Sequence, residues 1–354
     1  MKKIFFSIVA IAALAACTKS EVAYEAPQEI GFKAVAGNIT KAAVDGDEYP
    51  TTLGMYVYSW TTDFTGTDAN YIKKGLFVCK NESFEDYTDK EDATDVNPTV
   101  WGGQNPYYWP NTKSLHFAGY SASGNVASIT PTYDCSTGVL SIAGYTPGTS
   151  ENNDLMFFPS TAATKSAGYD KMTDYVPVNM LHTCAWISFY VKGDDVTGAA
   201  GSTYKVTDLT ITGIDATADL TCTQSSVSWA NNTATDATAA VLTSDVPLAG
   251  VTTTPVLAET NEGSTVLIPQ TPGKLSLTYT YNSPAGQQVS ETITGLDLSL
   301  DTRVEDADGE DDVVKTSWEA GKHYIYTITI KANEILIAPK PVDWTDGDFN
   351  ITVE

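Results

Sequence analysis

The side chain with the clearest chemical context is the thiol of Cys17, close to the start of the chain. It ends the stretch 14–17, which closes an apolar run that follows Lys2 and Lys3. The run is shorter than the ~20 apolar residues that a spanning helix needs. A basic start, a short apolar segment and small residues at its end are typical of a secretory signal. Small residues fit the active site of a signal peptidase, and the thiol beside them is a nucleophile that can be acylated.

The order Leu-Ala-Ala-Cys resembles the lipobox of bacterial lipoproteins. This resemblance implies that residues 1–16 are removed as a signal peptide and that Cys17 carries lipid. No later segment is long and apolar enough to span a membrane, so this lipid would be the only anchor. One acyl chain binds a membrane weakly, whereas two or three chains anchor a protein stably. An ordinary signal followed by a chance cysteine is the alternative.

The histidines do not form a recognisable catalytic or metal-binding pattern. His116, His182 and His323 each lie at or beside an apolar, strand-like stretch. None lies in an H-E-x-x-H motif or beside a cysteine at metal-binding spacing. The G-x-S-x-G motif and Gly-rich phosphate loops are also absent from the sequence. We therefore predict no metal, no cofactor and no catalytic residue.

Acidic residues offer two weaker alternatives. The run 301–312 could hold calcium through Asp306, Asp308 and Asp311. An EF-hand loop needs Gly at position six and Glu at position twelve, but Gly309 comes at position four and Ser317 at position twelve. We interpret the run as a solvated loop. A hydrolase whose two carboxylates converge in space stays an alternative, although the sequence points to no pair.

Aromatic residues gather in the stretch 101–110. Trp101, Tyr107 and Trp109 could stack on a sugar, or could pack in the core beside turns built by Pro106 and Pro110. We favour packing in the core and keep sugar stacking as an alternative.

The chain is strongly acidic, with a net charge of −24. A field of this sign repels phosphate backbones, so nucleic-acid binding is not expected. With Cys17 acylated, four cysteines remain: Cys79, Cys135, Cys184 and Cys222. They allow three disulfide pairings that sequence cannot distinguish, and they are too sparse for a disulfide-rich scaffold. We expect no essential disulfide.

Apolar and polar residues alternate through most of the chain, which is typical of β-strands. The stretch 275–282 puts Leu275, Leu277, Tyr279 and Tyr281 on one face, and 185–191 and 324–330 alternate in the same way. Turn residues separate these stretches, and no amphipathic helix of ordinary length occurs. We predict an all-β fold of antiparallel sandwiches. A polar stretch over 192–202 indicates a boundary between two halves.

Several stretches, taken in order, resemble the fimbrillin family of Bacteroidales, the subunits of type V pili. They are the Cys17 lipobox, EIGFKAVAGNITKAAV, PYYWPNTKSLHFAGYSA, LHTCAWISFYVK, SWEAGKHYIYTITI and VDWTDG. Together they extend over essentially the whole chain. The resemblance implies two tandem transthyretin-like β-sandwich domains, over residues 42–196 and 203–354. A spacer and a removable strand over 17–41 would precede them. The resemblance also implies export as a lipoprotein to the outer membrane and the cell surface.

The family implies a mechanism of assembly. A protease removes an N-terminal strand at a basic residue, and a strand from another subunit fills the vacated groove by β-strand addition. Family members commonly carry Thr-Arg-Ala at the cut, where this chain has Thr40, Lys41 and Ala42. Lysine lacks the guanidinium fork, so we expect an arginine-specific protease to fail here. Either a lysine-tolerant protease cuts the bond, or no cut is made.

Two short stretches are the candidates for this exchange. The face of the removable strand that would fill the groove consists of Ile30, Phe32, Ala34 and Ala36. An ordinary first strand that never leaves is the alternative. A C-terminal strand that enters a neighbour, or closes the chain's own sandwich, would use Ile335, Ile337, Val342 and Trp344. Pro339 and Pro341 indicate that this stretch bends or lies at a sheet edge.

The sequence thus predicts a structural pilus subunit, in the stalk or at the tip, that supports adhesion. Its partners would be other subunits, the outer membrane before processing, and a ligand on a host or bacterial surface. A surface lipoprotein that binds a glycan or host ligand without polymerising is the alternative. The sequence does not indicate the rank of the subunit (stalk, tip or anchor), the ligand or the protease.

Overall fold

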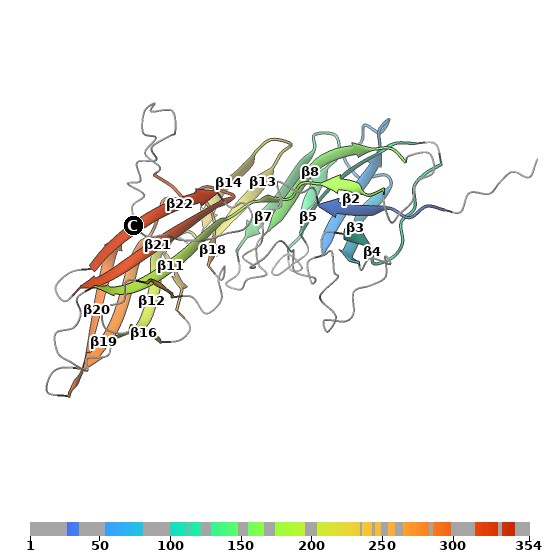
Figure 1. The fold of residues 1–354 in the computed structure, drawn as a ribbon. Coiled ribbons are helices and arrows are strands. Elements are labelled where there is room, and N and C mark those ends of the chain that lie inside the picture. The colour runs from blue at the N-terminus through green and yellow to red at the C-terminus, as the bar shows by residue number, and fades with distance from the viewer. Residues whose placement is uncertain are drawn as a thin grey trace, which may run out of the picture.

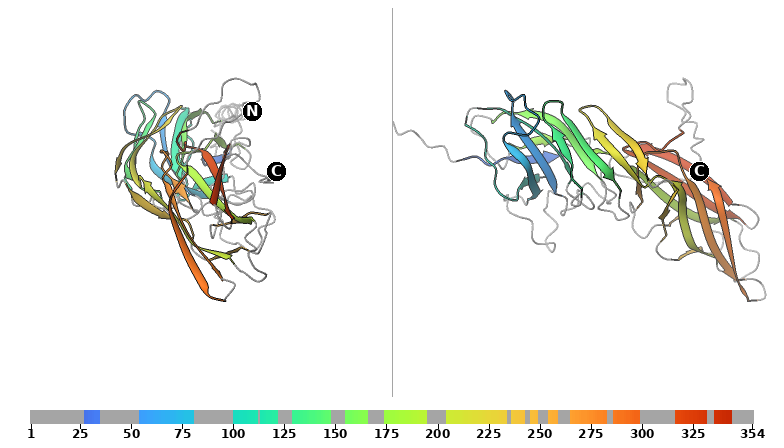
Figure 2. Two further views of the ribbon diagram at one scale, coloured as in Figure 1. Left: turned by 90° about the vertical axis from the view of Figure 1, so that its left-hand side faces the viewer. Right: turned by 180° about the vertical axis from the view of Figure 1, so that it is seen from behind.

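The computed structural model of the protein is built from β-strands. It describes residues 27–34, 54–80, 100–111, 113–121, 129–147, 155–165, 174–194, 204–233, 236–242, 245–248, 254–258, 265–282, 286–298, 316–331 and 335–343. Every regular element in these ranges is a strand, which confirms the all-β class. The molecule is elongated, with the first strands at one end and the last at the other (Figure 1, Figure 2). In the described ranges, no helix has the length and apolar character needed to cross a membrane.

The largest sheet holds the first strands of the chain. Its order is β10 (Leu181–His182), β8 (Met156–Ala163), β5 (Leu115–Ser121), β2 (Met55–Thr61), β3 (Ile72–Cys79), β4 (Val100–Gly103), β1 (Gly31–Ala34) and β9 (Val176–Val178). Side chains from β1, β2, β3, β4, β5, β8 and β9 meet in one cluster, which we call the N-terminal core. β9, at one end of the sheet, also contacts β8 near the other end. The sheet is therefore rolled around this core.

A second sheet covers the opposite face of β2, β5 and β8. Its order is β14 (Val227–Thr233), β13 (Thr217–Cys222), β7 (Val139–Tyr145) and β6 (Thr132–Asp134). Successive side chains of a strand point to opposite faces. Met55 and Val57 of β2 therefore enter the N-terminal core, while Tyr58 and Trp60 enter a middle core beneath the second sheet.

Two further sheets enclose a C-terminal core. One has the order β17 (Val256–Leu257), β11 (Ala185–Asp194), β21 (Lys322–Lys331) and β22 (Ile335–Asp343), and β18 (Val266–Leu267) also pairs with β11. The other has the order β15 (Ala237–Ala240), β12 (Tyr204–Ile214), β19 (Lys274–Asn282) and β20 (Gln288–Asp297), and β16 (Val246–Leu248) also pairs with β12. The alternation predicted for 275–282 is confirmed at Leu275 and Leu277, which are buried in this core, and at Tyr279, which is also buried.

Strand pairing differs from the predicted boundary between residues 196 and 203. β11 was expected in the N-terminal domain, but it pairs with β17, β18 and β21, all of which follow that boundary. β13 also pairs with β7 from the first half. The polar stretch 192–202 begins inside β11, the next described strand is β12, and both strands contribute to the C-terminal core. The chain passes here from one sheet to the facing one, but both strands pack in the same core. The tandem transthyretin-like arrangement stays a prediction.

β22 lies at the edge of its sheet, as its prolines indicate. Among the described strands it pairs with β21, in a continuous register from Lys322↔Asp343 to Ile330↔Ile335. Pro339 and Pro341 have no N–H, so the antiparallel bonds must run through the even-numbered residues of β22. The two prolines therefore turn their nitrogens to the open edge. An edge that lacks two hydrogen-bond donors is a poor template for a further strand.

Candidate functional site

Strand β1, which carries the predicted removable face, is an internal strand of the rolled sheet. It is antiparallel to β4, with Phe32 opposite Trp101, and parallel to β9, with Phe32 opposite Val176. Upstream of β1 the pairing continues with the residues that follow β4, where the Ile30 N–H donates to the Tyr107 C=O at 2.7 Å. A strand paired on both sides provides hydrogen-bond partners for its own backbone N–H and C=O groups and for those of two neighbouring strands.

Pro177 shows how the backbone of β1 is shared between these neighbours. Lys33 lies opposite Pro177 in the parallel register, and Phe32 lies opposite Val176. Because Pro177 has no N–H, the parallel ladder must be bonded through the N–H and C=O of Lys33. The backbone groups of Ile30 and Phe32 then point to the other side, in agreement with the bond from Ile30 to Tyr107.

The side chain of Phe32 is surrounded by aromatic rings. It is fully buried, and its ring meets Phe77 at 4.9 Å and 84° and Phe117 at 5.2 Å and 86°, both edge to face. Phe158 lies tilted at 6.2 Å. Edge-to-face contacts place the positive edge of one ring on the negative face of another. We call the site formed by Phe77, Phe117 and Phe158 the Phe32 pocket.

The walls of the Phe32 pocket are braced from behind. Tyr107 stacks on Phe77 at 5.5 Å, and Trp109 meets Phe117 edge to face at 5.6 Å. Glycines provide the room for these rings. A Cβ on Gly119 would lie 2.4 Å from the Phe158 ring, and one on Gly75 would lie 2.9 Å from the Tyr107 ring. Larger residues at these two positions would displace the walls.

The residues of the predicted face can be followed only in part. Ile30 and Phe32 are both fully buried in the N-terminal core, and the intervening Gly31 is also buried. Lys33 is exposed, with its Nζ 6.0 Å from the centre of the Tyr175 ring. Ala34 ends β1. Ala36 lies outside the described residues.

The aromatic residues that could have stacked on a sugar belong to this site instead. Trp101 is 1% exposed and Trp109 is 6% exposed, and both rings are part of the N-terminal core. Tyr107 is half-buried against the same core. Sugar stacking by Trp101 and Trp109 is therefore wrong, because a ligand cannot reach rings that are buried in the N-terminal core.

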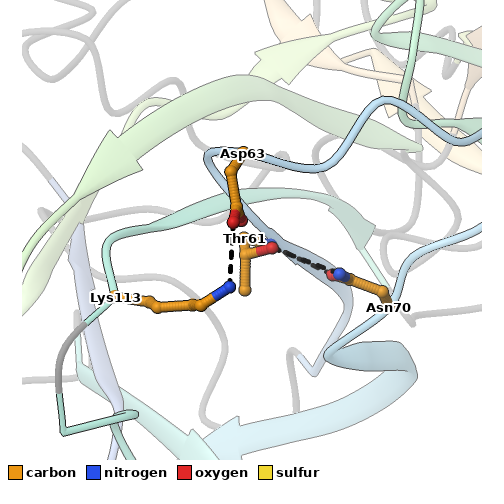
Figure 3. A network of polar contacts seen from close by, with 4 residues as sticks. All are labelled: Thr61, Asp63, Asn70 and Lys113. Atoms are coloured by element: carbon orange, nitrogen blue, oxygen red, sulfur yellow. Dashed lines mark hydrogen bonds and ion pairs between the residues drawn. The ribbon is translucent and has the colours of Figure 1, made fainter.

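A polar cluster fastens the turn after β2 to the start of β5 (Figure 3). Lys113 Nζ and Asp63 Oδ2 form an ion pair at 2.9 Å, and Asn70 exchanges hydrogen bonds with Thr61 at 3.0 and 3.2 Å. The Thr61 hydroxyl and the Lys113 ammonium lower the pKa of Asp63 to about 2. Because the ion pair is exposed, it contributes little to stability, and we interpret the cluster as a positioning feature.

The histidine closest to a possible nucleophile is a core residue. His323 is fully buried, its Nε2 and the Ser188 Oγ share a hydrogen bond at 2.9 Å, and its ring stacks on Trp186 at 3.5 Å. Burial lowers the pKa of His323 to about 3. A neutral, enclosed imidazole cannot reach a substrate, so this pair is structural.

The four cysteines other than Cys17 are buried thiols, namely Cys79, Cys135, Cys184 and Cys222. Burial raises the pKa of Cys79 to about 11 and that of Cys135 and Cys222 to about 12. In the described ranges, no group of three or more His, Cys, Asp or Glu side chains is arranged to hold a metal.

Several predicted sites lie outside the described residues. These are Cys17, the bond between Lys41 and Ala42, the acidic run 301–312, and Trp344. Ile335, Ile337 and Val342 lie in β22, which pairs within the chain. Sequence reasoning missed the Phe32 pocket and β9. The only signal for the pocket was the set of phenylalanines in apolar stretches, which does not show that they converge.

The comparisons with known proteins begin with family models. Residues 40–344 match a model described as fimbrillin-like. The chain belongs to the fimbrillin-like family. This confirms the resemblance stated from the sequence motifs. Residues 1–18 match the lipid attachment site of prokaryotic membrane lipoproteins, a range that contains Cys17. The fimbrillin-like match begins one residue before Lys41, so β1 precedes the matched range.

The chain is also similar to several solved structures. A fimbrial protein from Bacteroides vulgatus is similar over 90% of this chain and 100% of its own, at 16% identity and a TM-score of 0.55. A fimbrial assembly protein from Parabacteroides distasonis is similar over 89% of this chain and 96% of its own, at 11% identity and a TM-score of 0.41. The tip fimbrial protein Mfa3 from Porphyromonas gingivalis is similar over 89% of this chain and 98% of its own, at 12% identity and a TM-score of 0.37. At 16% identity, the similarity to the Bacteroides vulgatus protein shows a similar fold and nothing more. No curated protein matches the chain.

Proposed function

We propose that this fimbrillin-like chain is a structural subunit of a type V pilus that supports cell adhesion. It would be exported as a lipoprotein to the outer membrane and assembled by donor-strand exchange, without catalysis. The observation that carries the proposal is the position of β1. This strand lies inside a sheet and places Phe32 in the core, yet it precedes the fimbrillin-like match.

The covalent connection of β1 explains how a single cut could release it. β1 ends at Ala34 and β2 begins at Met55, and the bond between Lys41 and Ala42 lies between them. A cut there leaves β1 held only by its hydrogen bonds and by the burial of Ile30 and Phe32. Cys17 is on the same fragment, so the lipid would leave with the strand.

Loss of β1 would leave a site that another strand could fill. β4 and β9 would each lose a partner for their backbone groups, and the Phe32 pocket would be open to water. Unpaired strand edges and exposed apolar surface both favour the addition of another strand. A strand from a second subunit removes both penalties at once.

The experiment uses the full chain with Cys17→Ser, treated with a lysine-specific protease. We expect a cut after Lys41 followed by oligomer ladders on gels of unboiled samples. The matched control is Lys41→Gln, which should give neither, while Lys33→Gln in β1 should behave as the parent protein does. A clean cut after Lys41 that never yields oligomers would argue against a polymerising subunit.

A further inference from the structure

We propose that the Phe32 pocket selects the strand that enters the groove. The groove takes an extended strand of a second subunit with an aromatic ring at the position of Phe32 and an aliphatic residue two positions earlier. This inference rests on the proposed function, because a pocket can select only after β1 has left it. The selection has a side-chain part and a backbone part.

The side-chain part follows from the geometry of the walls. Phe77 and Phe117 both meet the ring of Phe32 edge to face, at 84° and 86°. An aliphatic side chain cannot make these contacts. The walls cannot close over a smaller side chain either, because Tyr107 and Trp109 brace Phe77 and Phe117 from behind. A site that cannot collapse discriminates strongly against a truncated side chain.

The backbone part excludes proline at defined positions. The N–H of Ile30 is bonded to Tyr107, and the backbone of Lys33 carries the ladder with β9. An entering strand therefore needs an N–H at both places. The side chain of Lys33 is exposed, so the residue type at that position is otherwise free to vary.

Both C-terminal candidates keep the two N–H groups, so the requirement for a ring separates them. Ile335 and Ile337 have the right spacing but bring no ring. Val342 and Trp344 keep the order of an aliphatic residue and, two positions later, an aromatic one, and the next residue, Thr345, retains its N–H. Of the two pairs, the second fits the pattern of Ile30 and Phe32.

The test is peptide exchange on the full chain with Cys17→Ser and a site-specific protease sequence inserted after Lys41. After the cut, a fluorescent peptide of residues 28–36 competes for the groove, and anisotropy gives its dissociation constant. The matched control is the Lys33→Ala peptide, which should bind within ~3-fold of the parent because that side chain is exposed.

The expected losses follow from the contacts. The Phe32→Ala peptide should bind at least ~100-fold more weakly, and the Phe32→Leu peptide at least ~10-fold more weakly through its missing edge contacts. The Lys33→Pro peptide should not bind. A Phe32→Leu peptide within ~3-fold of the parent would overturn the selection by the ring.

Failure of the proposed function gives a different result, in which no peptide, including the parent sequence, enters the cut chain. The pocket is then judged on the intact chain alone. There Phe32→Leu should lower the melting temperature by at least ~3 °C. An unchanged melting temperature overturns the pocket itself.

Discussion

Replacing Phe32 by alanine in the intact precursor should lower the free energy of unfolding by about 4 kcal/mol. Substitutions of buried Phe by Ala cost ~3–5 kcal/mol. Phe32 belongs in the upper half of this range because it is fully buried and its ring meets Phe77 at 4.9 Å and Phe117 at 5.2 Å. Each such aromatic pair adds ~0.5–1.5 kcal/mol to the effect of burial. The loss is a large share of the ~5–15 kcal/mol that stabilises an ordinary domain.

The assay is equilibrium urea unfolding of the chain with Cys17→Ser, followed by circular dichroism. Lys33→Ala is the matched control, because it changes the neighbouring residue of the same strand at an exposed position. Its effect should stay within ~0.5 kcal/mol. A cost below ~1.5 kcal/mol for Phe32→Ala would refute the reasoning, since β1 would then contribute no more than an ordinary surface strand.

Three further changes test other parts of the account. Burial holds the pKa of His323 at about 3, below its ordinary 6.5, so the unfolded chain binds a proton that the native chain does not. Stability is therefore complete above pH 6.5 and falls on acidification, by ~2 kcal/mol between pH 7 and pH 5. Urea unfolding of His323→Gln at both values should show a smaller difference, and an equal one would contradict the pKa. Lys41→Arg should make the bond cleavable by an arginine-specific protease, as seen by mass spectrometry, and resistance would show that the lysine is not what blocks it. Pro339→Thr with Pro341→Thr restores two outward N–H groups on β22 and should produce dimers in light scattering of the uncut chain, whereas a persistent monomer would show that the edge is closed by other means.

The alternation of apolar and polar residues predicts which face of a single strand is buried. It put Leu275 and Leu277 on one buried face, and the structure confirms both. It also put Ile30 and Phe32 on one face, and both are buried. Alternation is less informative where both faces of a strand are covered. Trp186 and Ser188 were expected opposite the apolar face of β11, but they are buried as well, beside His323.

The arrangement of strands could not be predicted in this way. Phe77, Phe117 and Phe158 come from β3, β5 and β8, and they converge only because the sheet order departs from the chain order. The parallel partner β9 lies more than a hundred residues from β1. The polarity of 192–202 also could not indicate that β11 pairs with strands of the second half, because a polar stretch does not show which sheet its neighbours join.

The most direct test of the central claim is the N-terminal residue of the protein in fibres sheared from cells, measured by mass spectrometry. We expect Ala42, which would show that β1 and its lipid have left the subunit. A protein that begins only with acylated Cys17 would contradict the account, since β1 would then still occupy its own groove.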